Sequence, residues 1–123
     1  MSLGKEWEEA YGYADALRAG ELLFCSGQVG LEEDGTAPAD PSRQYDLAFA
    51  AVGSVLAEHG LGPEHLVELV TFHTDYPQHM PEFMAAKARF QAGHRPAWTA
   101  VGVAALGTPG TLVEIKATAR FPD

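Results

Sequence analysis

Cysteine is almost absent from this sequence, and long apolar runs are absent altogether. Cys25 is the only thiol in 123 residues, so no internal disulfide can form, and a reducing cytoplasm suits the chain. No segment reaches the roughly 20 apolar residues of a membrane-spanning helix. The first residues have neither the charged nor the apolar region of a secretory signal. We therefore expect a cytoplasmic protein that has no membrane partner.

Basic residues are also scarce. Eight Lys and Arg stand against 17 Asp and Glu, which gives a net charge of −9 at pH 7. A homo-oligomer would multiply that charge and would repel the phosphate backbone of a nucleic acid at long range. The composition therefore argues against nucleic acid as a partner.

Repeats, low-complexity tracts and linkers are missing too, so nothing divides the chain. Apolar residues make up 46% of the sequence and charged residues 20%, which is an ordinary globular composition. A chain of this length can bury its own core. We expect residues 1–123 to form a single domain.

Two segments have the apolar periodicity of helices. The first covers residues 41–59, with Asp40 at the N-cap, Pro41 at the first helical position and Gly60 after the end. Its apolar residues recur at steps of three and four, which predicts one buried stripe. The second covers about residues 81–91.

Strand patterns occur at residues 22–26, 66–75, 97–103 and 112–121, separated by turns rich in Gly and Pro. This order of strands and helices predicts an α+β fold with both helices on one face of a sheet. Residues 97–103 are apolar or small on both faces. Because two helices cover only one face, we expect another subunit to bury the other.

Five short motifs follow one another between about residues 13 and 115: Tyr13 before a strand, residues 23–28 (LFCSGQ), residues 72–75 (FHTD), residues 96–97 (PA) and residues 112–115 (LVEI). Each is weak alone. Their order and spacing resemble the RidA (YjgF-like) family, which has also carried the label endoribonuclease L-PSP.

The resemblance implies a chorismate-mutase-like α+β fold, with a mixed six-stranded sheet and two helices on one face. It also implies a homotrimer with a barrel-like sheet core and small-molecule pockets at the subunit boundaries. The best-known activity of the family is hydrolysis of reactive 2-enamines and 2-imines. That activity uses no cofactor and no metal.

On this resemblance the candidate site has one catalytic residue, Glu114, and six ligand-binding residues: Tyr13, Ser26, Gly27, Phe83, Trp98 and Ala100. Three of them depart from the deaminating relatives. Trp98 stands where those relatives have an Arg, Ala100 where they have Cys or Thr, and Phe83 where they have Asn.

The replaced Arg matters for the chemistry. Imine hydrolysis needs a held substrate, an oriented water and an acid or base beside it. In the relatives the Arg is thought to hold the substrate carboxylate through two charge-assisted hydrogen bonds. Losing the partner of a buried carboxylate costs about 2–5 kcal/mol. We therefore expect this chain to be a poor 2-iminopropanoate deaminase.

Several candidate residues have a second interpretation. Glu114 could instead pair with Lys116 or Arg120, Trp98 could simply pack at an interface, and Tyr13 could cap an interface. Phe83 is more typical of a core residue.

Two further groups carry possible chemistry. His73 and Asp75 alternate onto one face of a strand, where a hydrogen-bonded pair is favoured over a metal site, because supporting ligands are missing at a suitable spacing. Cys25 follows three apolar residues and should be an inert, buried thiol.

Three functions remain open at this point. The first is a trimeric binding or divergent catalytic protein, whose pocket takes a neutral or cationic amine-like ligand against Trp98 and Glu114. The second is an active enamine or imine deaminase for substrates without a carboxylate. The third is a ribonuclease, which the acidity and the lack of a basic stripe disfavour.

Overall fold

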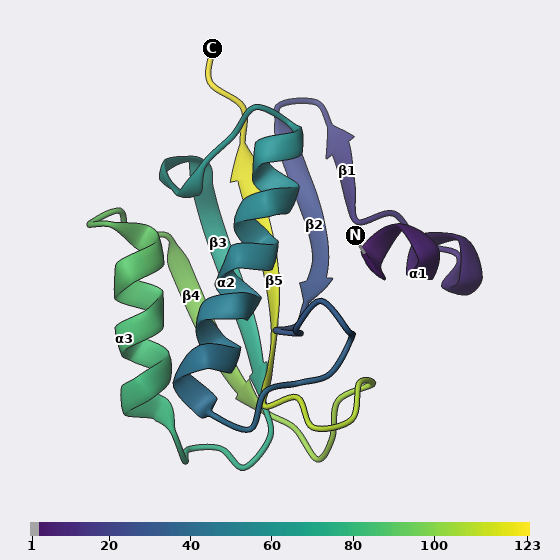
Figure 1. The fold of residues 1–123 in the computed structure, drawn as a ribbon. Coiled ribbons are helices and arrows are strands. Elements are labelled where there is room, and N and C mark those ends of the chain that lie inside the picture. Colours follow the sequence, from purple (N-terminus) through teal and green to yellow (C-terminus); the bar gives the residue numbers. More distant parts are fainter. Residues whose placement is uncertain (1–2) are drawn as a thin grey trace.

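The computed structural model describes residues 3–123 (Figure 1). The elements follow in this order: α1 (Leu3–Tyr11), β1 (Ala16–Ala19), β2 (Leu22–Gln28), α2 (Pro41–Glu58), a 3-10 turn η1 (Pro63–His65), β3 (Leu66–His73), α3 (Met80–Gln91), β4 (Ala97–Gly102) and β5 (Val113–Arg120). The expected helices at residues 41–59 and 81–91 are thus confirmed within one or two residues, as are the four expected strands within two.

The strands form a mixed sheet in the order β1-β2-β5-β3-β4. Only β3 and β4 run parallel, because α3 crosses over between them; the other neighbours are antiparallel. The expectation of six strands was wrong, since the described residues supply five. The long connections at residues 29–40 and 103–112 contain Gly and Pro and form turns rather than a sixth strand.

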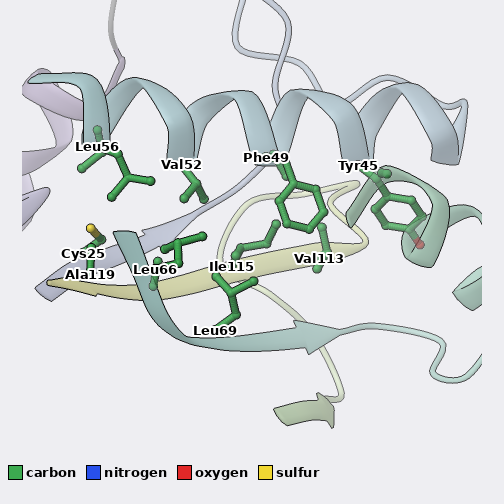
Figure 2. Close-up of a cluster of buried hydrophobic side chains, with 14 of the residues drawn as sticks. Cys25, Tyr45, Phe49, Val52, Leu56, Leu66, Leu69, Val113, Ile115 and Ala119 are labelled. Atoms are coloured by element: carbon green, nitrogen blue, oxygen red, sulfur yellow. The ribbon is translucent and has the colours of Figure 1, made fainter. Parts of the chain in front are cut away.

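Helices α2 and α3 cover one face of the sheet, as expected (Figure 1). Figure 2 shows Phe49, Val52 and Leu56 of α2 pointing toward the sheet residues of β3 and β5. The alternate residues of β5 that face them are at most 1% exposed: Val113, Ile115, Ala117 and Ala119. The period-two pattern of this strand thus places one side in the core.

No helix within residues 3–123 covers the other face of the sheet (Figure 1). Leu17 of β1 and Phe24 of β2 are paired on this face and are 65% and 44% exposed. Val101 of β4, paired with Phe72, is 37% exposed on the same face. The open face is defined here by Leu17, Phe24, Phe72 and Val101, and it is the surface for which a covering subunit was expected.

Helix α1 was not expected. Its sequence is rich in good helix formers, and it ends where Gly12 adopts the left-handed conformation with φ 70°. Figure 1 shows α1 beyond β1, at the edge of the sheet and away from α2 and α3.

Candidate functional site

Glu114 lies on β5, opposite Phe72 of β3, and therefore projects from the open face of the sheet. Its side chain lies over Gly27 of β2, so closely that a β-carbon at position 27 would stand 2.5 Å from Glu114 Oε2. The β2–β5 pairing is interrupted between Cys25 and Gln28, where β2 bulges. The glycine of the residue 23–28 motif thus makes room for the carboxylate.

A cavity of about 620 Å³ opens beside Glu114. It is bordered by Trp7, Tyr11, Tyr13, Gly27, Val29, Gly107, Thr108, Pro109 and Glu114. Three of the predicted site residues, Tyr13, Gly27 and Glu114, therefore meet at one cavity. Burial raises the pKa of Tyr13, and the negative charges of Asp15, Glu8 and Glu114 raise it further, so Tyr13 keeps its hydroxyl proton at neutral pH.

Ser26 holds the segment that carries Tyr13. Its hydroxyl donates a hydrogen bond of 2.6 Å to the carbonyl oxygen of Ala14, and its backbone N–H donates to the carbonyl of Asp15. Residues 14 and 15 are thereby fixed against β2. Ser26 does not border the cavity, so its geometry is that of a positioning residue.

Trp98 lies on the opposite face of the sheet from Glu114. The β3–β4 register pairs Trp98 with Leu69, which is fully buried under the helices, and paired residues of neighbouring strands share a face. The indole Nε1–H donates to Thr71 Oγ1 at 2.9 Å. Lys87 Nζ lies 4.4 Å from the ring centroid. Within one chain, Trp98 and Glu114 cannot wall the same pocket.

Ala100 and Phe83 also lie on the helix side. Ala100 pairs with the buried Thr71 and so shares its face. Phe83 is fully buried and packs edge-on against His73, with ring centroids 4.6 Å apart. Its position is that of a core residue, and neither side chain borders the cavity at Glu114.

His73 pairs with Thr71 rather than with Asp75, so the expected His73–Asp75 pair is absent. His73 Nε2 lies 2.8 Å from Thr71 Oγ1. Because the indole of Trp98 can only donate to that oxygen, the Thr71 hydroxyl proton is free to point at His73. Burial lowers the pKa of His73 to about 4, which agrees with a neutral ring. Asp75 is exposed in the turn after β3.

The thiol of Cys25 carries little reactivity. Cys25 is buried in the core, and burial raises the pKa of its thiol to about 11, so its thiolate is rare at neutral pH.

Within residues 3–123, no three His, Cys, Asp or Glu side chains gather closely enough to hold a metal ion.

Comparison with known proteins places the chain in a family. Residues 4–121 match the family model described as Endoribonuclease L-PSP. The chain belongs to this family. It is 42% identical over 112 residues to the RutC family protein YjgH of Escherichia coli K12, which covers 90% of this chain and 84% of YjgH.

Solved structures of similar proteins share the fold. A structure of YjgH superimposes with a TM-score of 0.84 at 40% identity, covering 94% of this chain and 88% of that one. Mycobacterium tuberculosis Rv2704, a member of the YjgF/YER057c/UK114 family, gives a TM-score of 0.84 at 31% identity and covers 98% and 96%. E. coli TdcF with bound serine gives 0.82 at 25% identity and covers 89% and 88%. The α+β architecture expected from the motifs is thus confirmed.

Two aromatic residues of the cavity were missed by the sequence analysis. Trp7 and Tyr11 lie one helical turn apart on α1 and both border the cavity. Their spacing of four residues places them on one side of a helix. This spacing was the one signal in the sequence that could have linked the two rings.

Neither alternative partner, Lys116 or Arg120, forms an ion pair with Glu114 in the described part of the chain. Arg120 Nη2 pairs with Glu21 at 3.1 Å, and Lys116 makes no ion pair in the described part of the chain. None of the described residues that border the cavity is Lys, Arg or His. Within residues 3–123 of one chain, the carboxylate therefore faces the cavity without a cationic partner. No helix among residues 3–123 is long and apolar enough to cross a membrane.

Proposed function

We propose that this L-PSP family protein is a homotrimer that binds a small molecule beside Glu114 and hydrolyses 2-iminopropanoate poorly. The observation that carries the proposal is the composition of the cavity at Glu114. It contains a carboxylate and tyrosine hydroxyls but no cationic side chain among the described residues. A substrate carboxylate would meet a like charge there and find no clamp.

The proposed trimer would turn the cavity at Glu114 into a pocket at a subunit boundary. The open face around Phe24 and Val101 exposes apolar side chains, and apolar area of this kind is typically covered by a partner. Glu114 projects from that same face. Covering the face with a neighbouring copy would close the cavity toward the solvent and leave the ligand at a subunit boundary.

Glu114 would serve as the general base in any residual hydrolysis. Its carboxylate takes a proton from a water molecule while the water oxygen bonds to the imine carbon. Glu114 returns this proton to the nitrogen as the C=N bond becomes a single bond. It then carries the hydroxyl proton of the resulting aminocarbinol to the nitrogen, so that the C–N bond breaks and ammonia leaves as the carbonyl forms. Tyr13, whose hydroxyl stays protonated, would donate a hydrogen bond to the substrate. The serine bound by TdcF supports a small molecule as the ligand.

A substrate without a carboxylate remains the second candidate, because the base is present while the anion clamp is not. A ribonuclease is disfavoured, since a phosphate backbone would meet Glu114 rather than a basic side chain. The cytoplasmic location, the absence of a cofactor and the absence of nucleic-acid and membrane partners stay predictions.

The test compares this protein with a relative that carries the Arg, under the same conditions. With 2-iminopropanoate, kcat/KM should be lower here by about 30- to 5,000-fold, which is the kinetic equivalent of a bound substrate carboxylate that has no cationic partner. Glu114→Gln should lower the remaining rate further. Equal turnover by the two proteins would contradict the proposal, and sedimentation equilibrium of the same sample should show a trimer.

A further inference from the structure

The cavity at Glu114 has a wall that is rich in aromatic side chains. Three of its bordering residues are aromatic, namely Trp7, Tyr11 and Tyr13, and a fourth is the carboxylate of Glu114. Tyr11 borders this cavity and is 74% exposed in the single chain, so its ring is accessible to a ligand.

The segment that presents the rings is held by one residue, Glu8. Its carbonyl oxygen accepts hydrogen bonds from the backbone N–H groups of Gly12 and Tyr13, at 3.0 and 3.2 Å. Its carboxylate accepts the N–H of Asp15. These bonds tie the end of α1 to the start of β1, so the rings of α1 and the ring of Tyr13 border the same space.

The electrostatics of that space favour a positive charge. The pKa of Tyr13 is raised by burial and then by Asp15, Glu8 and Glu114, and Tyr11 also contributes, so several acidic groups lie within range of one hydroxyl. Aromatic faces attract cations through their quadrupole, by about 0.5–2 kcal/mol per contact. A carboxylate attracts the same charge. An anionic ligand would be repelled by both kinds of group.

We propose that Trp7, Tyr11 and Tyr13 form an aromatic cage that, with Glu114, binds the cationic head of an organic ammonium compound. This inference rests on the proposed function in that it uses the same cavity, and it names the class of ligand. The cavity of about 620 Å³ is larger than such a head, so an attached chain would lie along Val29 and Pro109.

The first experiment needs no variant. Choline, its neutral isostere 3,3-dimethylbutan-1-ol and the anion 3,3-dimethylbutanoate have nearly the same shape and differ in charge. Isothermal titration calorimetry on the wild-type protein should give a dissociation constant for choline at least about tenfold below that of the alcohol. The anion should bind weakest. Equal affinity of choline and the alcohol would overturn the cage.

Matched variants separate the cage from general charge attraction. Tyr11→Leu should weaken choline by about three- to tenfold, whereas Tyr76→Leu, at an exposed tyrosine that borders no described cavity, should not. Glu114→Gln should weaken choline binding. Glu9→Gln removes the same charge from a residue of α1 that does not border the cavity, and it should leave choline affinity unchanged. Equal effects within each pair would overturn the cage.

The outcome also separates this inference from the proposed function. Serine is the second probe, because a family relative binds it. If serine binds and is lost in Glu114→Gln while choline shows no preference over its isostere, the pocket stands and the cage falls. If neither probe binds, and 2-iminopropanoate hydrolysis is unaffected by Glu114→Gln, the proposed site itself is wrong.

Discussion

The side chain of Glu114 on β5 fills the space that a β-carbon of Gly27 on β2 would need. A β-carbon at position 27 would stand 2.7 Å from both Cγ and Cδ of Glu114, in addition to its close approach to Oε2. Since Gly27 has no left-handed backbone angle, the need for glycine here comes from the neighbouring side chain and not from the turn.

The first prediction follows from that contact. Gly27→Ala should force Glu114 into another rotamer and weaken ligand binding as much as Glu114→Gln does, at a cost of about 1–3 kcal/mol in the free energy of unfolding. Calorimetry and chemical denaturation measure the two effects. The double variant Gly27→Ala/Glu114→Ala should recover most of that stability, because the clash is removed. A double variant no more stable than Gly27→Ala would show that the backbone is strained instead.

The second prediction concerns pH and His73. Burial lowers the pKa of His73 to about 4, whereas an unfolded His titrates near 6.5. Between these pH values the unfolded chain binds a proton at His73 and the folded chain does not. The free energy of unfolding therefore has its full value above about pH 6.5 and falls as the pH drops toward 4. The loss should be on the order of 3 kcal/mol.

His73→Gln provides the check on this assignment. The variant removes the titrating ring while keeping a side chain that can accept from Thr71. Urea denaturation at a series of pH values should show a flatter slope between pH 4 and 6.5 than in the wild-type protein. His94→Gln, whose ring contacts the carbonyl oxygen of Leu66 and not Thr71, is measured alongside as the matched His-to-Gln control. An unchanged slope in His73→Gln would refute the prediction.

The third prediction tests the open face. Phe24→Glu places a charge among Leu17 and its neighbours on the surface for which a partner subunit is proposed. Sedimentation equilibrium should show the trimer dissociating, because burying an unpaired carboxylate costs several kcal/mol. Met84→Glu on α3 is the matched control, since its side chain is 43% exposed against 44% for Phe24. Dissociation by the Met84 variant alone would place the interface on the helix side.

Much of the fold was predictable because its signals are local. Helix α2 has Asp40 at its N-cap, Pro41 at its start and an apolar stripe facing the sheet, all of which lie in one stretch of sequence. The period-two alternation of β5 likewise places Val113 and Glu114 on opposite faces. Helix α1 was not predicted, because a helix of nine residues is only marginally stable without tertiary contacts.

Three of the residues that the sequence motifs grouped into one site, Tyr13, Gly27 and Glu114, do border one cavity. For these three the sequence by itself was enough. Trp98 is the contrary case. Because β4 is apolar or small on both faces, its alternation carries no information about direction, and only the parallel pairing with β3 placed Trp98 beside Thr71 under α3. The aromatic wall was decided in the same way, since Trp7 and Tyr11 reach the cavity only through the turn that Glu8 ties to Tyr13. Faces and turns of this kind depend on contacts between distant segments, which no local pattern records.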